Sequence, residues 1–297
     1  MYICRTIDGK SIAASIKAET VDLLKSKKDG SRPAILAISV GNNPAVESYS
    51  SQKERSAVSI GIDFRRKHFG PDASEEDVIF ALEEASDDKK TDAIMIHTPI
   101  PSGFGIERLS DLIPAEKDVD CLNSVSRGLL YSGRPLFLPA TAEAVIEILK
   151  HEHIETAGKH AVILGRSLTV GRPLASLLLM HGASGNATVT VCHSMTRDLS
   201  KFTRQADILI AAVGRPRLIS GEMIAKGATV IDVGINAVAS RGSKEQFVMT
   251  GDVDFDSASL VAGAITPVPG GVGPVTTAVL MRNVVRAWLG RKSLGNN

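Results

Sequence analysis

The sequence predicts an α/β protein of two domains, one of them built on a doubly wound parallel sheet. The 297 residues suit two domains of about 150 residues each. Hydrophobic residues make up 43% and charged residues 23% of the chain, which are globular proportions. From residue 158 onward, continuous Val/Ile/Leu runs alternate with helical segments. Such runs are typical of strands buried on both faces of a parallel sheet.

The first 142 residues alternate between helices and strands at longer and less regular intervals. Apolar residues at helical spacing predict the helices, and compact apolar runs predict the strands. The expected elements are helix 7–25, strand 32–41, helix 44–60, strand 62–69, helix 73–85, strand 92–101 and helix 138–150. Thr141 is the expected N-cap of the last helix, with Glu143 close behind.

The second half predicts a Rossmann-type domain over 143–271. Its expected strands are "HAVILG" (160–165), "ATVTVCH" (187–193), "ADILIAAVG" (206–214) and "GATVIDVGI" (227–235). The helix "VTTAVLMRNVVRAWL" (275–289) follows this domain and has a strong apolar face that needs a partner. We therefore expect 272–297 to complete an α/β substrate domain formed by 1–142.

Charge and cysteine usage exclude several classes of partner. A net charge of +1 provides no field to attract nucleic acid or an anionic membrane, so neither is expected as a partner. Cys4, Cys121 and Cys192 show no CxxC or metal-ligand spacing, so we expect free thiols and no metal. No apolar run approaches about 18 residues, which favours a cytoplasmic protein.

A glycine-containing loop follows the first strand of the Rossmann-type domain. "GRSLTVGRP" (165–173) has Gly165 and Gly171 but lacks the middle glycine of the GxGxxG pattern. The loop ends a buried strand and enters a helix whose start Pro173 is expected to set. Its free N–H groups would then face a pyrophosphate. The alternative is a tight turn that needs glycine for its backbone angles alone.

The end of the next strand indicates which dinucleotide is bound. NAD sites usually place an acidic residue there, whereas "VCHS" (191–194) is followed by no acid before Asp198. The hydroxyl of Ser194 together with Arg166, and with Arg197 as a second candidate, favours a 2′-phosphate and therefore NADP. The alternative is that both arginines are solvated surface residues.

Four residues of the first domain are candidates for the chemistry. Tyr49 and Lys53 lie at i and i+4 of one expected helix face, although a lysine among charged neighbours is commonly a surface residue. His97 follows a strand at the edge where open α/β sheets bind ligands, although a lone histidine is commonly structural. Asp120 lies in "EKDVDC" (116–121), which is otherwise explained as a capped loop.

A second glycine-rich stretch, "ITPVPGGVGPVTTAVL" (265–280), opens the final helix but lacks the lysine of a P-loop. Its "TPVPGGVGPVT" is the last of eight motifs that occur in a recognisable order between about residues 7 and 288. The other seven are "YSSQK", "TPIP", "KDVD", "GRSLTVGRPLA", "TVTVCHSMT", "ADILIAAVG" and "VIDVGIN". The sequence resembles the bifunctional methylenetetrahydrofolate dehydrogenase/methenyltetrahydrofolate cyclohydrolase family in nearly its whole length.

The resemblance implies NADP-dependent oxidation of 5,10-methylenetetrahydrofolate and hydrolysis of the methenyl product to 10-formyltetrahydrofolate, by a homodimer without a metal. It implies Lys53 as the catalytic lysine, Tyr49 as packing on the folate ring system and Asp120 as binding the pterin. The implied cofactor contacts are Gly165, Arg166, Ser167, Ser194 and Ile235. The implied folate contacts in the glycine-rich turn are Pro269, Gly270 and Gly271, where a Cβ would collide with the ligands.

The chain departs from the family pattern on the folate side. His97 replaces a glutamine, Cys121 a glycine and Ser126 an asparagine, and "PATAEA" (139–144) replaces "PCTPxG". NADP binding is therefore a firmer expectation than substrate turnover. The alternatives are a dehydrogenase-only family member, an NADP dehydrogenase for another small substrate, and a catalytically silent folate- or nucleotide-binding protein.

His97 is the departure closest to the expected chemistry. Hydrolysis needs a partly neutral Lys53 to accept a proton or to order the attacking water, and the family's glutamine would hold that amine. A histidine protonated near its ordinary pKa of about 6.5 would instead repel both the lysine and the cationic substrate. We therefore expect weak hydrolysis that falls further below about pH 6.5, unless His97 stays neutral and replaces glutamine competently.

Overall fold

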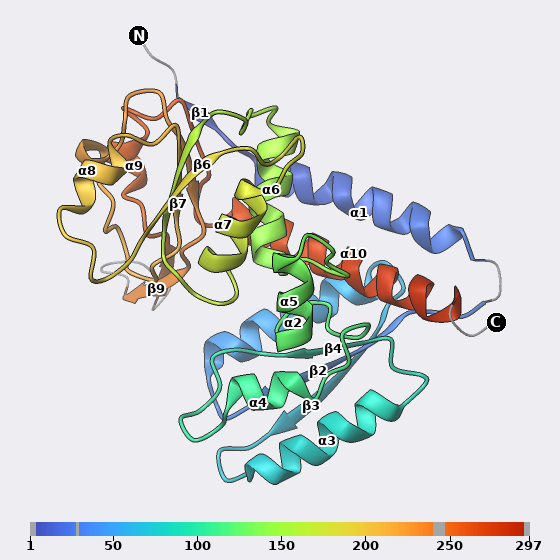
Figure 1. Cartoon of the computed structure of the whole chain (residues 1–297). Coiled ribbons are helices and arrows are strands. Elements are labelled where there is room, and N and C mark those ends of the chain that lie inside the picture. Colours follow the sequence, from blue (N-terminus) through green and yellow to red (C-terminus); the bar gives the residue numbers. More distant parts are fainter. Residues whose placement is uncertain (1–3, 28–29, 240–246, 294–297) are drawn as a thin grey trace. The chain divides into compact units, whose positions relative to one another are not determined.

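The computed structural model of the chain describes residues 4–27, 30–239 and 247–293 (Figure 1). The chain forms two compact units. Unit 1 consists of residues 1–13 and 141–276, and unit 2 of residues 14–140 and 277–297. Three helices contain the passages between the units: α1 (Gly9–Lys25), α6 (Ala140–His151) and α10 (Val272–Ser293). Within the described residues, no helix is long and apolar enough to cross a membrane.

Unit 2 is built on a three-stranded sheet in the order β3-β2-β4, with both strand pairs parallel. Its strands are β2 (Ala34–Val40), β3 (Asp63–Phe69) and β4 (Ala93–Ile96), and its helices include α2 (Pro44–Val58), α3 (Glu75–Asp87), α4 (Ile106–Asp111) and α5 (Ser124–Tyr131). The polar side chains of Ser74 and Asp77 form a capping box that begins α3. A core of buried residues from β2, β4, α3 and α4 includes Ile38, Leu82 and Ile94.

The C-terminal helix α10 completes unit 2 from Thr277 onward, as the sequence predicted. Its Asn283 is fully buried and donates through Nδ2 to the carbonyl oxygens of Val119 and Leu138, both at 3.2 Å. Trp288 is also buried, at 1% exposure. This helix therefore ties together the segments before and after Asp120.

Unit 1 contains a six-stranded parallel sheet in the order β1-β11-β8-β7-β5-β6. The strands are β1 (Arg5–Thr6), β5 (His160–Leu164), β6 (Thr188–Cys192), β7 (Ile208–Ala211), β8 (Thr229–Asp232) and β11 (Ala264–Ile265). The connecting helices are α7 (Gly171–Leu179), α8 (Leu199–Thr203), η1 (Gly221–Met223) and α9 (Phe255–Ala258). The doubly wound, Rossmann-type sheet is confirmed.

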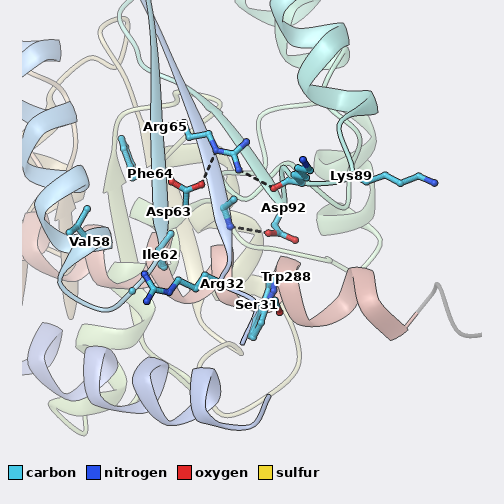
Figure 2. A pocket seen from close by; sticks show the side chains of 13 residues that line it. Ser31, Arg32, Val58, Ile62, Asp63, Phe64, Arg65, Lys89, Asp92 and Trp288 are labelled. Carbon is cyan, nitrogen blue, oxygen red and sulfur yellow. Dashed lines mark hydrogen bonds and ion pairs between the residues drawn. The ribbon is translucent and has the colours of Figure 1, made fainter. Parts of the chain in front are cut away.

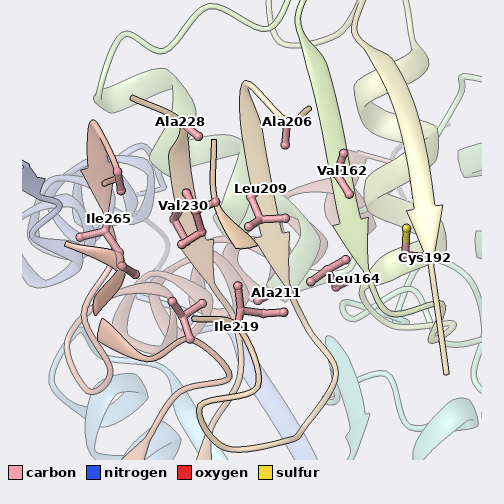
Figure 3. Close-up of a cluster of buried hydrophobic side chains, with 14 residues drawn as sticks. Val162, Leu164, Cys192, Ala206, Leu209, Ala211, Ile219, Ala228, Val230 and Ile265 are labelled. Atoms are coloured by element: carbon pink, nitrogen blue, oxygen red, sulfur yellow. The ribbon is translucent and has the colours of Figure 1, made fainter. Parts of the chain in front are cut away.

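The central strands of this sheet are buried on both faces. Val162 and Leu164 of β5 lie with Leu209 and Val230 of the neighbouring strands in one hydrophobic cluster (Figure 3). The intervening residues point to the other face because side chains alternate along a strand, and Ile163 among them is also fully buried. Continuous apolar runs in the sequence therefore predicted these strands correctly.

Three details of the elements differ from the sequence-based expectations. Thr141 is not the N-cap of α6, because the helix already begins at Ala140. The first backbone N–H of the helix is satisfied by the side chain of Asp120, at 3.0 Å, so no local cap at Thr141 is needed. Strand β4 ends at Ile96, which makes it shorter than expected, and the antiparallel hairpin of β9 (Asn236–Ala239) and β10 (Phe247–Thr250) was not predicted.

Candidate functional site

Helix α2 carries the two candidates nearest to one another in the sequence. Tyr49 and Lys53 lie one helical turn apart on one face of α2, and both are partly buried. Burial lowers the pKa of Lys53 below the ordinary value of a lysine, and the nearby carboxylate of Asp120 opposes this shift. Burial likewise raises the pKa of the Tyr49 hydroxyl. Lys53 is therefore not the solvated surface residue of the alternative interpretation.

Asp120 provides the opposite charge in this cluster. Burial raises the pKa of its carboxyl above the ordinary value, while Lys53 and the N–H of Ala140 act in the other direction. Oδ1 accepts that N–H at 3.0 Å, so the carboxylate is fixed at the start of α6. Among the described residues no hydrogen bond to Oδ2 is found, which leaves this oxygen for a ligand.

His97 completes the cluster from the carboxyl end of β4. Its backbone N–H donates to the carbonyl oxygen of Ile38 at 2.8 Å, which extends the ladder between β4 and β2 by one residue. The residue is only 4% exposed, and its buried Nε2 has no hydrogen-bond partner among the described residues. A buried nitrogen without a partner costs free energy, so this atom is available to bind a ligand or a water molecule.

The expected protonation of His97 near pH 6.5 is wrong. Burial, and then the positive charges of Lys53 and Arg66, lower the pKa of His97 to about 3. An imidazolium here would be both desolvated and close to two other cations, so the ring stays neutral at physiological pH. The predicted fall of hydrolysis below about pH 6.5 therefore has no basis in the protonation of this residue.

The residues around Asp120 hold the fold instead of facing a ligand. Lys117 is buried, and its Nζ donates to the carbonyl oxygens of Ala85 (3.0 Å), Ser86 (2.6 Å) and Asp88 (2.9 Å) at the end of α3. Asp118 accepts the backbone N–H groups of residues 122 and 123, both at 2.9 Å. The capped-loop interpretation is therefore correct for these two residues but does not describe Asp120.

Cys121 has a left-handed backbone with a φ of 54°, the conformation that glycine adopts most easily. Burial and the carboxylates of Asp118 and Asp120 raise the pKa of the Cys121 thiol to about 12. The thiol is therefore unreactive at neutral pH.

The strand order of unit 1 reverses direction at β5. The chain passes from β5 to β6 on one side and then returns to β7 on the other side of β5. Such a reversal opens the crevice in which doubly wound folds bind dinucleotides. The loops at this point start at Gly165 after β5 and at Ala212 after β7, and they pack so tightly that a Cβ at Gly165 would collide with the carbonyl of Ala212.

The two glycines of the first loop are required by the chain itself. Gly165 has a φ of 119°, and a Cβ at Gly171 would collide with the carbonyl oxygen of Gly165. The hydroxyl of Ser167 accepts the N–H groups of Val170 at 3.1 Å and Gly171 at 3.4 Å, where α7 begins. The tight-turn interpretation is thus sufficient to explain these glycines, and it remains compatible with a cofactor contact.

Arg166 and Ser194 follow the ends of two paired strands. Leu164 pairs with Cys192 at the ends of β5 and β6, so the residues after both strands lie at the same edge of the sheet. Both side chains are exposed, and neither has a hydrogen bond or ion pair with any residue in the described part of the chain. Arg197 and Ile235 are also exposed, the latter at 43%.

The glycine-rich turn before α10 packs against the beginning of α1 within unit 1. Pro269 follows a cis peptide bond, and Gly270 has a φ of 108°. A Cβ at Gly271 would lie 2.6 Å from the carbonyl oxygen of Pro267, and a Cβ at Gly9 would collide with the carbonyl oxygen of Gly271. The packing of the chain therefore already requires glycine at position 271, without any ligand.

A cavity of about 640 Å³ lies at the opposite edge of the unit 2 sheet, where the three strands begin (Figure 2). Its lining includes Arg32, Arg65, Asp92 and Trp288 (Figure 2). Arg65 is held by an ion pair with Asp63 at 2.8 Å. None of the site residues predicted from the sequence lines this cavity.

Two family models match the chain. The catalytic domain of tetrahydrofolate dehydrogenase/cyclohydrolase matches residues 7–120, and the NAD(P)-binding domain of the same enzymes matches residues 139–292. "Bifunctional protein FolD" of Nocardia farcinica is 44% identical over 283 residues, covering 95% of this chain and 96% of the relative. "Bifunctional protein FolD 2" of Desulfitobacterium hafniense is 41% identical over 285 residues, covering 96% of each.

Solved structures show the same similarity. The Trypanosoma brucei methylenetetrahydrofolate dehydrogenase-cyclohydrolase, complexed with NADP cofactor and inhibitor, matches with a TM-score of 0.92 at 34% identity and 100% coverage of both chains. A 5,10-methylenetetrahydrofolate dehydrogenase from the silkworm Bombyx mori matches with a TM-score of 0.89 at 38% identity, covering 99% of this chain and 100% of that one.

Proposed function

The chain belongs to the tetrahydrofolate dehydrogenase/cyclohydrolase family, and on that premise we propose that it oxidises 5,10-methylenetetrahydrofolate with NADP and hydrolyses the methenyl product to 10-formyltetrahydrofolate. The observation that carries the proposal is the partly buried cluster of Lys53, Asp120 and His97. It combines a lysine of lowered pKa, a carboxylate with one unused oxygen and a histidine with an unpartnered nitrogen. Perturbed titratable groups that cluster in this way are typical of functional sites.

The cofactor half of the proposal depends on charge. Arg166 donates to the 2′-phosphate of NADP and Ser194 adds a hydroxyl contact, since neither side chain is engaged within the described residues. A nicotinamide nucleotide held by these residues would supply the acceptor for the hydride from the one-carbon bridge of the folate. The product of this step is a resonance-stabilised cation, so the protein needs mainly to position the two reactants.

On the folate side, Asp120 accepts hydrogen bonds from the pterin through Oδ2, and Tyr49 packs on the ring system. Oδ1 is already engaged with the N–H of Ala140, which holds the carboxylate in one orientation. A fixed acceptor of this kind binds the pterin without reorganisation.

Hydrolysis requires a base for the attacking water. Oxygen of the water bonds to the methenyl carbon, and one water proton passes to Nζ of Lys53, which burial keeps less basic than an ordinary lysine. The bond from this carbon to N5 of the folate then breaks with its electron pair going to N5, which takes up a proton. The hydroxyl loses its remaining proton as the formyl carbonyl forms on N10. The neutral ring of His97 can donate to or accept from the amine or the water through Nε2, the hydrogen-bonding capacity that a glutamine would also offer. His97 therefore acts as a competent substitute for glutamine.

One assay tests the proposal and separates its alternatives. The absorbance of NADPH and of methenyltetrahydrofolate is followed after mixing the protein with methylenetetrahydrofolate and NADP, and then with NAD. NADPH formation with decay of the methenyl product supports both activities. NADPH formation without that decay indicates a dehydrogenase alone, and no change in either signal contradicts the proposal.

The assembly and the compartment are also proposed. The three cysteines at positions 4, 121 and 192 are free, which is consistent with the reducing cytoplasm. We expect a homodimer that pairs through the cofactor unit, where the edge strand β6 presents Val191 at 36% exposure. Light scattering after size-exclusion chromatography measures the mass, and a monomer of 31.4 kDa would contradict the dimer.

A further inference from the structure

Two buried carboxylates in unit 1 have no role in the chemistry described so far. Asp232 is the last residue of β8, and Asp252 follows β10. The two residues are 3% and 0% exposed. Burial of a carboxylate is costly unless its oxygens accept hydrogen bonds, so the groups that they bind indicate what they are for.

Asp252 holds the loop that follows β7. Its Oδ2 accepts the backbone N–H groups of Val213 at 2.6 Å and Gly214 at 2.9 Å, and its Oδ1 accepts that of Arg215 at 2.9 Å. Oδ1 also accepts a hydrogen bond from Nδ2 of Asn236 at 2.9 Å, which is the fourth bond to this carboxylate. Three consecutive backbone N–H groups are therefore fixed by one side chain.

Asp232 in turn holds Asp252 in place. Its Oδ1 accepts the backbone N–H groups of Asp252 and Gly234, both at 3.0 Å, and its Oδ2 accepts that of Val253 at 2.9 Å. The contacts form a chain in which β8 fixes the backbone of Asp252, and the side chain of Asp252 fixes the loop after β7.

Two glycines provide the space for these carboxylates. A Cβ at Gly234 would collide with the carboxyl group of Asp252, and a Cβ at Gly251 would collide with the carboxyl group of Asp232. Gly234 lies close to Asp232 in the sequence but makes room for Asp252, and Gly251 precedes Asp252 but makes room for Asp232. The segment after β8 and the segment after β10 therefore depend on each other.

The loop that Asp252 holds lies at the point where the strand order reverses, which is where doubly wound folds bind dinucleotides. It follows β7, and its residue Ala212 contacts Gly165, which begins the loop after β5. We propose that Asp252, supported by Asp232, is a positioning residue that fixes Val213–Arg215 in the geometry that binds the nicotinamide nucleotide. This inference rests on the proposed NADP-dependent function.

The charge of Asp252 also acts on Asp232. Burial, together with the charge of Asp252, raises the pKa of Asp232 to about 6. Asp252 is the charged group that acts on Asp232 among the described residues, and the other neighbours are backbone N–H groups. Protonation of Asp232 would weaken its hold on Asp252, so acidification from about pH 7 to pH 5 should loosen the loop.

The test compares Asp252→Asn with Asp207→Asn. Asp207 accepts the N–H of His160 at 2.8 Å at the opposite edge of the same sheet, so its variant also weakens a carboxylate contact to backbone in unit 1. NADP binding is measured by calorimetry, and hydrolysis of methenyltetrahydrofolate, which consumes no nucleotide, is measured separately. An amide accepts on one side only, so we expect Asp252→Asn to weaken NADP binding about tenfold or more. Hydrolysis by Asp252→Asn should stay within about twofold of the wild type. NADP binding by Asp207→Asn should also stay within about twofold of the wild type.

A second variant, Asp232→Asn, provides a pH readout that a merely structural role would not give. Its amide has no charge to lose, so the ratio of its NADP dissociation constant to that of the wild type should fall toward one on acidification. The 2′-phosphate of NADP titrates equally in both proteins and cancels in the ratio. If the Asp252→Asn protein fails to fold, the Asp232→Asn variant serves as the test instead.

Three results would overturn the inference. The first is NADP binding by Asp252→Asn that equals the wild type. The second is an equal loss of NADP binding and hydrolysis, which would make Asp252 a general structural residue. The third is an affinity ratio for Asp232→Asn that does not change with pH. A wild-type protein that binds no NADP would instead refute the proposed function itself.

Discussion

Lys53 and Lys117 offer a paired prediction, because the chain places two poorly exposed lysines in opposite roles. Lys117 donates to three carbonyl oxygens at the end of α3, whereas Lys53 lies in the candidate site with a lowered pKa. Replacing each by methionine keeps most of the side-chain length and removes the charge. Lys117→Met should therefore damage stability, and Lys53→Met should damage activity.

The magnitudes follow from the contacts. Loss of three charge-assisted bonds to buried carbonyls should cost Lys117→Met about 3–5 kcal/mol, which corresponds to a fall in Tm of about 10 °C. In Lys53→Met, removal of a desolvated ammonium is favourable, and the loss of charge opposite Asp120 is unfavourable. These effects oppose each other, so its Tm should stay within about 3 °C of the wild type.

The assay measures thermal unfolding by circular dichroism and methenyltetrahydrofolate hydrolysis at a temperature where all three proteins are folded. Hydrolysis by Lys53→Met should fall by about 10²–10⁴, the contribution of a positioned base. Hydrolysis by Lys117→Met should stay within about threefold of the wild type. Rapid hydrolysis by Lys53→Met, or a Tm loss equal to that of Lys117→Met, would refute the role assigned to Lys53.

Three further predictions concern the other site residues. Arg166→Ala should weaken NADP binding by at least about tenfold and leave NAD binding little changed, because only NADP carries the 2′-phosphate. Equal losses of affinity for the two nucleotides in a binding titration would contradict this. Asp120→Asn should raise the KM for the folate without altering NADP affinity, since Oδ1 is already engaged with Ala140; NADP binding lost in step with activity would make Asp120 structural. His97 has a pKa of about 3 in the folded protein against about 6.5 unfolded, so the unfolded chain binds the extra proton between these values. The free energy of unfolding of the wild type should therefore fall relative to that of His97→Gln by about 1.4 kcal/mol for each pH unit below 6.5. The rates of hydrolysis by the two proteins should coincide from pH 6 to 8. Denaturant titrations in which the two free energies do not diverge on acidification would refute the lowered pKa of His97.

Much of the fold could be predicted because its signals are local. Long apolar runs at 160–164 and 208–211 identified strands buried on both faces, and helical spacing identified α2 and α6. β1 and β11 could not be predicted, because each contains only two residues and depends on pairing between distant segments. The N-cap of α6 was missed for the same reason: its partner, Asp120, lies twenty residues earlier in the chain.

The sequence nominates the residues of the candidate site but does not reveal their electrostatics. Motif order and the family resemblance nominate Lys53, Asp120 and His97, and their roles stay predictions. The pKa of His97 depends on burial and on two cations from other elements, which no single segment of sequence reveals. Asp232 and Asp252 were missed as individual residues because their partners are backbone N–H groups, which leave no pattern in side-chain identity.

The unused hydrogen-bonding capacity of a buried group separates the residues that hold the fold from those that face a ligand. In "EKDVD", Lys117 and Asp118 bind several backbone groups, whereas Asp120 binds one and has an oxygen with no hydrogen bond from any residue that the structure describes. The buried Nε2 of His97 likewise has no partner within the described ranges. Such capacity destabilises the folded chain, and the favourable bond that compensates for it can form only when a ligand or water arrives. The motif alone does not separate the two roles, so the bonding geometry adds support to the proposal that Asp120 and His97 contact the substrate.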